Sequence, residues 1–353
     1  MKILIYGAGA VGGYLGARLS QQKHEVTLIT RDVAAQLISA NGLAITENGR
    51  RSVTRPVILT SLHQAFKDAT TYDLLVMSMK SYDLTVALDS LVAFCPDPPP
   101  IITIQNGIDV EQPLIDQFGA ERIIAGSVTI PLRKETTDHI VVERPDRGLT
   151  LAPTQSRQDI KQWVNLFQQT GITTDSVKDY QRMKWSKTLL NIVGNATSAI
   201  LNRRPETVYK SDILFDLEVR MLQETLAVMK ALKIKVIDLP GSQAKRLAFG
   251  AKRMPKGLLK PIMTNLVTSG RGGKMPSFFI DLQEGKGKSE VIFHNGAIAK
   301  AGETCGIPAP VNMALNDTLM KLTLKETNWR DYDGRPKRLL ADVRRYETTM
   351  GLR

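Results

Sequence analysis

The stretch "KILIYGAGAVGGYLGARLSQQKHEVTLITRD", residues 2–32, predicts a strand, a glycine-rich turn, a helix and a second strand, in that order. Residues 2–6 form a short apolar run, and residues 7–12 then place three glycines in the pattern G-x-G-x-x-G. Apolar residues at helical spacing follow, and a second apolar run covers residues 26–29. This order is typical of the unit that opens a doubly wound α/β domain.

The glycine turn points to a bound dinucleotide, because it lies between a strand and a helix. Glycines let the backbone turn tightly and approach a pyrophosphate, whose charge the amides and the dipole at the helix N-terminus stabilise. A glycine turn without a ligand is the alternative, and the position of the motif disfavours it. The predicted dinucleotide-binding residues of this turn are Gly7, Ala8, Gly9, Ala10, Val11 and Gly12.

Arg31 determines which dinucleotide we expect. NAD enzymes usually place a carboxylate at the end of the second strand, whereas a 2′-phosphate favours an arginine. The sequence has Thr30, Arg31 and Asp32 at this point, with the arginine first. We therefore predict NADP(H), while the neighbouring Asp32 keeps NAD(H) open.

Two further predicted strands, residues 74–77 and 101–104, end in polar residues. In open α/β sheets, ligands bind just beyond the carboxyl ends of the strands. Lys80 and Asn106 follow these ends, so we expect both near a cofactor and substrate. For Lys80 alone, a solvated loop position is an equally good interpretation.

The length of 353 residues suits two domains, because single cores stop growing near about 250–300 residues. We expect a Rossmann-type doubly wound α/β domain at residues 1–178, completed by strands within 122–130 and 139–153. An all-α domain should follow at residues 179–325, and then a charged extension at 326–353. Predicted helices of the second domain cover residues 184–201, 212–233 and about 309–325, with another starting near a capping Ser289.

Composition excludes several classes of protein. No apolar run approaches the roughly 20 residues of a membrane span, so we expect a cytoplasmic protein without membrane contact. Two cysteines exclude a disulfide framework, and four scattered histidines show no metal-ligand spacing. The net charge of +12 suits an acidic small-molecule ligand, and no nucleic-acid-binding motif accompanies it.

Lys187, Asn191 and Asn195 recur at a spacing of four, which on a helix puts them on one face. An ammonium group beside two carboxamides suits a carbonyl substrate, because these groups donate hydrogen bonds to oxygen. Lys184 also lies on this face and is a rival acid. The alternative is a surface helix that shows its polar side to water.

These motifs together resemble the ketopantoate reductase (2-dehydropantoate 2-reductase) family. The matches run in order over roughly residues 1–320, so the set is more specific than any one motif. They are "GAGAVGGYLGARL" at 7–19, Arg31, "MKSYD" at 79–83, "QNGI" at 105–108, K-x-x-x-N-x-x-x-N at 187–195 and "PSFFIDL…SEVIFHNG" within 276–296.

The resemblance implies an NADPH-binding domain, a helical domain and an active site between them that reduces ketopantoate to pantoate, a step of pantothenate biosynthesis. Lys187 then corresponds to the proton donor. The implied substrate-binding residues are Asn106, Asn191, Asn195 and Ser277. The implied cofactor-binding residues beyond the glycine turn and Arg31 are Lys80, Asn106 and Glu290.

Two segments depart from the family pattern. Residues 242–275 are longer than expected and carry eight basic residues without an acidic one. This basic segment forms a solvated helix pair, widens the cleft for a larger anionic substrate, or contacts a membrane surface or nucleic acid. The extension at 326–353 should form a terminal helix packed on its own subunit or on a second copy in a homodimer.

Two other functions remain open from the sequence. One is an NADP-linked dehydrogenase that acts on another, larger or more anionic substrate. The other is a non-catalytic NADPH-binding regulator, which the lysine, asparagine and serine residues after position 180 disfavour because a sensor needs only the first domain.

Overall fold

The opening strand, helix and second strand form where the sequence predicts them in the computed structural model, which describes residues 1–271 and 274–352. Strand β1 (Lys2–Tyr6) leads through the glycine turn into helix α1 (Ala10–Gln21), and β2 (Glu25–Ile29) follows. β1 and β2 pair in parallel along their whole length. The apolar run at residues 3–5 is fully buried, which explains why this strand lies inside the sheet.

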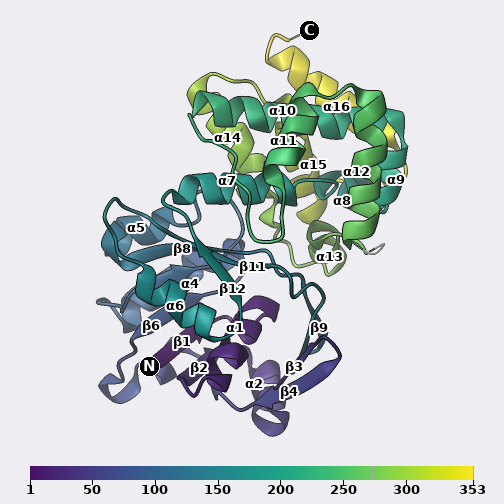
Figure 1. Cartoon of the computed structure of the whole chain (residues 1–353). Helices are drawn as coiled ribbons and strands as arrows, with labels where there is room; N and C mark the ends of the chain where they lie inside the picture. Colours follow the sequence, from purple (N-terminus) through teal and green to yellow (C-terminus); the bar gives the residue numbers. More distant parts are fainter. Residues whose placement is uncertain (272–273, 353) are drawn as a thin grey trace. The chain divides into compact units, whose positions relative to one another are not determined.

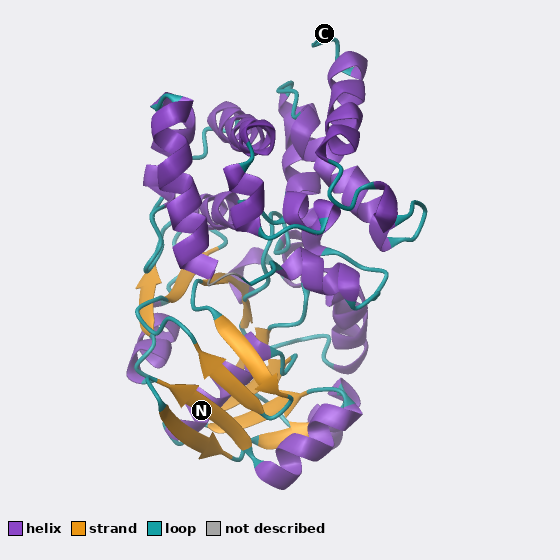
Figure 2. Ribbon diagram, turned by 90° about the vertical axis from the view of Figure 1, so that its right-hand side faces the viewer, coloured by secondary structure: helices purple, strands orange, loops and turns teal. Residues whose placement is uncertain are grey.

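A mixed, mostly parallel sheet of eight strands organises the first half of the chain, in the order β12-β11-β8-β7-β6-β1-β2-β5 (Figures 1 and 2). All neighbouring pairs are parallel except β11 and β8. The predicted α/β fold class is confirmed. The remaining strands are β5 (Val57–Leu59), β6 (Leu74–Met77), β7 (Ile101–Thr103), β8 (Ile123–Val128), β11 (Gly148–Pro153) and β12 (Thr173–Ser176).

A second, smaller sheet lies against α1, and the sequence did not predict it. Its order is β4-β3-β10-β9, built from β3 (Leu43–Glu47), β4 (Arg50–Thr54), β9 (Leu132–Thr136) and β10 (His139–Val142). Of the two stretches expected to complete the main sheet, residues 122–130 do so as β8. Within residues 139–153 only β11 joins it, because β10 pairs with β3 and β9 instead. Gly13 of α1 permits the close packing, since a Cβ there would lie 2.8 Å from Ile140 Cδ1.

The chain forms two compact units, and every strand of the described residues belongs to the first. That unit comprises Met1–Asn106, Val110–Met183 and Leu239–Ser242. Five helices complete it: α2 (Asp32–Asn41), α3 (Leu62–Ala65), α4 (Leu84–Phe94), α5 (Gln112–Phe118) and α6 (Lys161–Gln169).

The second unit takes in Gly107–Asp109, Lys184–Asp238 and the chain after Ser242, and it is helical in its described part. The predicted all-α class is therefore confirmed. Buried side chains of α10 and α15 form the centre of its apolar core. No helix among the described residues is long and apolar enough to cross a membrane.

The helices of this part of the chain are α7 (Tyr180–Asn191), α8 (Ala196–Leu201), α9 (Pro205–Lys210), α10 (Asp212–Ala231), α11 (Ala244–Arg253), α12 (Lys256–Arg271), α13 (Ser277–Gln283), α14 (Asn295–Cys305), α15 (Pro310–Thr323) and α16 (Pro336–Thr349).

The predicted single helix over residues 184–201 is wrong, because the chain breaks between α7 and α8. Gly194 adopts φ +59°, a left-handed conformation that favours glycine. Asn195 therefore lies after the break and is the residue that precedes α8, instead of the next polar residue along one helix. The four-residue spacing therefore does not place the three side chains on one face of a single helix.

A buried carboxylate holds this break. Glu218 of α10 is 1% exposed and accepts hydrogen bonds from Gly194 N (2.7 Å), Thr197 Oγ1 (2.6 Å) and Tyr209 OH (2.9 Å). A buried charge is stable when hydrogen bonds replace the water it loses. Glu218 thus joins the break, α8 and α9 to the long helix α10.

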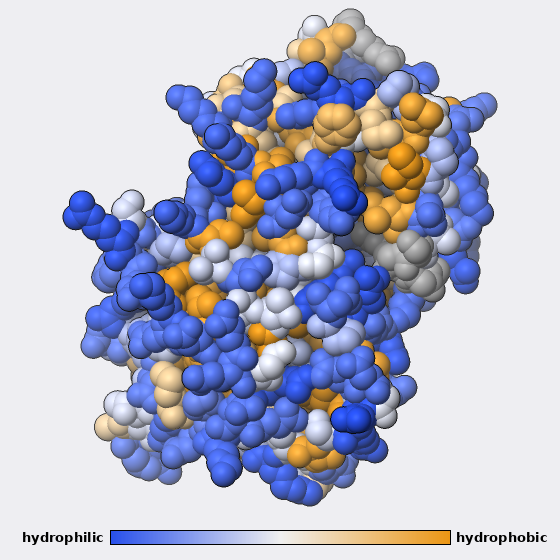
Figure 3. Space-filling model, viewed as in Figure 1, coloured by the Kyte–Doolittle hydropathy of each residue, from blue (hydrophilic) through white to orange (hydrophobic). Residues whose placement is uncertain are grey.

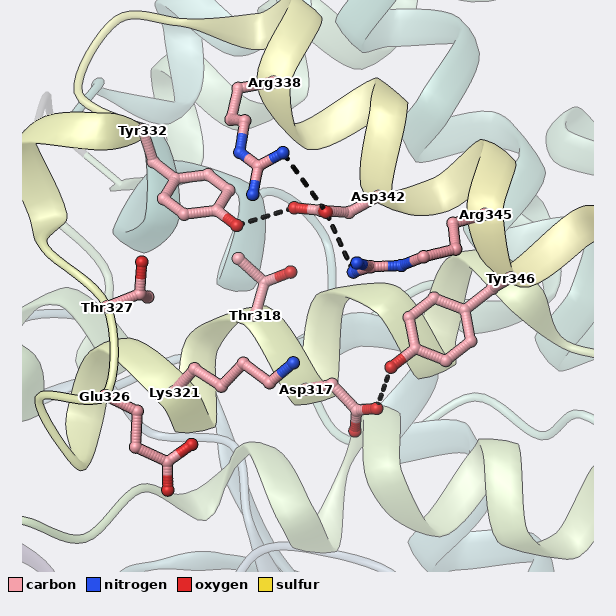
Figure 4. A pocket seen from close by; sticks show the side chains of 10 residues that line it. All are labelled: Asp317, Thr318, Lys321, Glu326, Thr327, Tyr332, Arg338, Asp342, Arg345 and Tyr346. Carbon is pink, nitrogen blue, oxygen red and sulfur yellow. Dashed lines mark hydrogen bonds and ion pairs between the residues drawn. The ribbon is translucent and has the colours of Figure 1, made fainter. Parts of the chain in front are cut away.

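The C-terminal extension packs on the same unit. Leu339 and Val343 of α16 belong to the helical core, and Trp329 Nε1 donates to the carbonyl oxygens of Ala199 and Ile200, both at 3.0 Å. A hollow of about 280 Å³ lies between α15 and α16 (Figure 4). Across it, Tyr332 OH donates to the buried Asp342 (2.6 Å). Tyr346 OH of α16 donates to Asp317, and this pair joins the extension to α15.

The basic segment forms α11 and α12 and leaves an apolar stripe exposed, which is visible in Figure 3. Lys256 and Lys260 pair with Asp216 and Asp212 of α10, so part of its charge is neutralised. Residues 272–273 and the side chain of Arg271, which belong to this segment, lie outside the described residues. The exposed apolar side chains are Phe249, Leu258, Ile262 and Leu266.

We expect Glu218→Gln to lower the free energy of unfolding by about 2–3 kcal/mol, because the new amide group faces donors and leaves a buried one unsatisfied. Urea unfolding followed by circular dichroism measures this change. The control is Glu206→Gln, whose carboxylate lies on the surface beside Lys210 and should leave unfolding unchanged. Equal midpoints for the two variants would contradict the role given to Glu218.

Candidate functional site

The glycine turn is fixed by hydrogen bonds to the two strands beside β1. Gly7 N and Ala8 N both donate to Ile29 O at the end of β2, each at 3.1 Å. On the other side, Ser78 Oγ donates to Gly7 O (2.6 Å), directly after β6. These hydrogen bonds within the protein therefore fix the backbone of the glycine turn.

The glycines of the turn have different tasks. Gly7 has φ +108°, and a Cβ there would lie 2.7 Å from Met79 N. A Cβ on Gly12 would clash with Gly7 O and Ser78 Oγ, so the protein itself requires both glycines. Gly9 is different, because nothing lies within 4 Å of the position its Cβ would take.

The open space at Gly9 fits an anionic group. Gly9 precedes α1 without a side-chain cap, and the first turn of α1 has no acidic residue. The amides at this helix N-terminus are thus available to a phosphate, as a dinucleotide requires. Ala8 is buried beneath the turn, while Ala10 and Val11 begin the helix.

Arg31 lies at the start of α2, where the chain leaves β2, and its side chain is exposed. No hydrogen bond or ion pair joins its guanidinium group to the described residues. Asp32 is the first residue of α2, where a carboxylate interacts favourably with the helix dipole. The helix therefore accounts for Asp32, and Arg31 is the cation at the end of β2.

The loops after β6 and β7 lie together, because these two strands are neighbours in the sheet. Ser81 Oγ donates to Asn106 O (2.5 Å), which joins the loop that carries Lys80 to the loop that carries Asn106. Both residues are half-buried. Sequence reasoning missed Ser81 and Ser78, although both follow the strand end that singled out Lys80.

Asn195, Ser277 and Asn191 form a second group, in the helical unit. Asn195 Nδ2 lies 3.2 Å from Asn191 O and 3.4 Å from Ser277 Oγ, and Asn195 Oδ1 accepts from Phe278 N (3.2 Å). The carboxamide of Asn195 is therefore oriented by the first turn of α13. Its neighbour Gly194 is held by Glu218, which sequence reasoning missed because nothing marks a glutamate inside an apolar helix as a partner.

Lys187 lies one turn before Asn191 on α7 and is half-buried. The rival Lys184 is 2% exposed, so it does not lie on an accessible face. This difference favours Lys187 as the lysine that a small molecule can reach.

Glu290 begins a short 3₁₀ turn, Glu290–Phe293, and its side chain is buried. Ser289 caps this turn, since its hydroxyl accepts from Val291 N (3.3 Å), whereas the helix predicted to start near Ser289 begins only at Asn295, as α14. At the end of the turn, Phe293 O accepts from Ile108 N (2.9 Å), and Ile108 follows Asn106 by two residues. No group of three or more His, Cys, Asp or Glu in the described part of the chain is arranged to hold a metal ion.

Two family models match the chain: "Ketopantoate reductase PanE/ApbA" over residues 3–155 and "Ketopantoate reductase PanE/ApbA C terminal" over residues 179–323. The extension after residue 323 lies outside both. A relative, the 2-dehydropantoate 2-reductase of Pyrococcus horikoshii, is 28% identical over 321 residues, which cover 89% of this chain and 95% of the relative.

Solved structures share the fold. The PanE/ApbA family ketopantoate reductase from Ralstonia eutropha JMP134 has a TM-score of 0.77 and 23% identity, and the match covers 93% of this chain and 100% of that one. D-mandelate dehydrogenase, in a ternary structure with NADH and anilino(oxo)acetate, has a TM-score of 0.75 and 19% identity over 92% and 98% of the two chains.

The two family matches follow one another along the chain and coincide with the α/β half and the helical half of the fold. This chain therefore belongs to the ketopantoate reductase PanE/ApbA family and is an oxidoreductase of that family.

Proposed function

We propose that this protein reduces a 2-oxo acid to a 2-hydroxy acid with NADPH, and that ketopantoate is its first candidate substrate. The observation that carries the proposal is the oriented carboxamide of Asn195, which lies beside Ser277 Oγ and the last turn of α7. Such a group of neutral donors and acceptors beside a lysine suits a substrate with carboxylate, carbonyl and hydroxyl oxygens.

The first unit has the task of binding the nucleotide. The α1 amides and the space at Gly9 accept the pyrophosphate, and Arg31 accepts the 2′-phosphate. Lys80 and Asn106 of this unit, and Glu290 of the helical unit, are the further residues that we assign to the nucleotide, and Asn106 also to the substrate. A bound nicotinamide nucleotide supplies the hydride.

The second unit has the task of stabilising charge on the substrate. When a carbonyl carbon accepts a hydride, negative charge develops on its oxygen. The Lys187 ammonium group stabilises that oxygen and donates a proton from Nζ, which completes the alcohol. Asn191, Asn195 and Ser277 hold the other oxygen atoms, so that the carbonyl faces both the hydride and the lysine.

A second candidate function is the reduction of a bulkier 2-oxo acid with NADH. The observation that favours it is the fold shared with D-mandelate dehydrogenase, whose solved complex contains NADH and anilino(oxo)acetate. The basic helix pair α11–α12, which departs from the family pattern, is the part of the chain that a larger substrate would use.

NADPH oxidation at 340 nm with ketopantoate and with a panel of bulkier 2-oxo acids tests the proposal. We expect Lys187→Ala to lower kcat by at least about 100-fold, because the proton donor is lost, while NADPH binding stays unchanged. Lys210→Ala is the matched control on the surface of the same unit. Tight NADPH binding without turnover of any 2-oxo acid would refute the proposed reaction.

Arg31→Ala should weaken NADPH binding by about 10- to 100-fold and leave NADH binding unchanged, because one charge-assisted contact to the 2′-phosphate is lost. Fluorescence titration of both nucleotides measures the two dissociation constants. Arg50→Ala, on the exposed strand β4 of the same unit, is the control. Equal weakening of NADPH and NADH would show that Arg31 does not recognise the 2′-phosphate.

Gly9→Ala should fold normally, since Gly9 has negative φ and open space around its Cβ position. Its methyl group would occupy the proposed pyrophosphate position, so we expect NADPH affinity to fall at least about tenfold. Gly257→Ala also enters open space and should leave binding unchanged. Thermal unfolding of both variants separates loss of binding from loss of folding, and unchanged binding by Gly9→Ala would argue against this pyrophosphate position.

A further inference from the structure

A lysine from the small sheet reaches the glycine turn. Lys134 lies in β9, at the edge of that sheet, and its Nζ donates to Ala8 O (3.2 Å), 126 residues away in the sequence. The strand is positioned by rigid elements, because the small sheet packs on α1 through Gly13 and Ile140. The ammonium group is therefore held at the turn that begins α1.

Two cations near Lys134 have carboxylate partners. Arg133 pairs with Glu135 (3.7 Å) and Glu143 (3.4 Å). Arg18 of α1 pairs with Glu47. Lys134 makes no ion pair with the described residues, and its only hydrogen bond there goes to a neutral carbonyl oxygen.

Lys134 is an exposed residue, and its ammonium group is only partly buried where it meets the turn. Burial lowers the pKa of Lys134 below its ordinary value, and the attraction of Asp138 offsets this only in part. The first turn of α1 also lacks an acidic residue, so nothing on that side balances the ammonium group. An anion bound at the turn would supply the missing charge.

We propose that Lys134 is a phosphate-binding residue that contacts the pyrophosphate of the dinucleotide from the side of the small sheet. This inference rests on the proposed function, since it names a further residue of the same nucleotide site. The helix amides supply directed hydrogen bonds, and a lysine ammonium group adds a mobile point charge that does not depend on one geometry. The pyrophosphate is thus held between α1 and β9.

Direct nucleotide binding tests the proposal without relying on turnover. The variants are Lys134→Met, the charge-retaining Lys134→Arg, and the matched control Arg133→Met, which removes a cation from the adjacent, oppositely directed position of the strand. Fluorescence titration with NADPH and NADH at low and high salt gives the dissociation constants, and thermal unfolding reports folding.

Lys134→Met should raise the dissociation constants of NADPH and NADH by the same factor, about tenfold, because both share the pyrophosphate. Its binding should also depend less on salt, while Lys134→Arg and Arg133→Met stay near the wild type. Unchanged binding by Lys134→Met, or weakening of NADPH alone, would overturn the proposal. A wild-type protein that binds neither nucleotide would instead refute the proposed function.

Discussion

The close approach of three strands at the glycine turn is the constraint on which the first unit depends. A Cβ on residue 12 would clash with Gly7 O and Ser78 Oγ. Helix α1 can therefore start this close to the ends of β1 and β6 only because residue 12 is a glycine. By contrast, the space around the Cβ position of Gly9 is open, and no side chain caps the first amides of α1. Packing and ligand binding therefore make the same demand on the sequence, and glycine is the residue that satisfies both.

The helical unit relies on two carboxyl groups of α10, the buried Glu218 and the half-buried Glu224, to arrange its irregular parts. Glu218 fixes the break before α8, and Glu224 accepts from Val311 N (2.9 Å) and Asn312 N (3.0 Å) at the start of α15. Burial raises the pKa of Glu224 to about 7, although these donors favour its ionised form. Both side chains accept hydrogen bonds from backbone amides of segments outside α10 that have no partner within their own helix. The single helix α10 therefore fixes the positions of several other segments. Asn195 owes its position to this arrangement.

Periodicity predicted much of the fold, and its failures have physical causes. The strands β1, β2, β6 and β7 were predictable because buried parallel strands are continuous apolar runs bounded by polar turns. Residues 50–54, "RRSVT", form a strand with mostly exposed side chains, so they give no such signal.

The break at Gly194 was missed because an isolated glycine is tolerated within helices, and only its buried partner Glu218 makes it end the helix. Lys80 and Asn106 could be singled out because each follows the end of a predicted strand. The hydrogen bond between Ser81 and Asn106 could not be predicted, because it joins segments that are distant in the sequence.

The net charge of +12 alone does not identify the chemistry of the ligand. Lys256 and Lys260 add to that total, yet each pairs with an aspartate of α10 and so carries little field outward. Arg31 and Lys134 count the same in the total but have no carboxylate partner among the described residues. They come from different elements: Lys134 of β9 contacts the glycine turn between β1 and α1, and Arg31 lies between β2 and α2. Since both lie at segments that the sequence assigns to the dinucleotide, their positions indicate an anionic ligand more specifically than the charge of the whole chain.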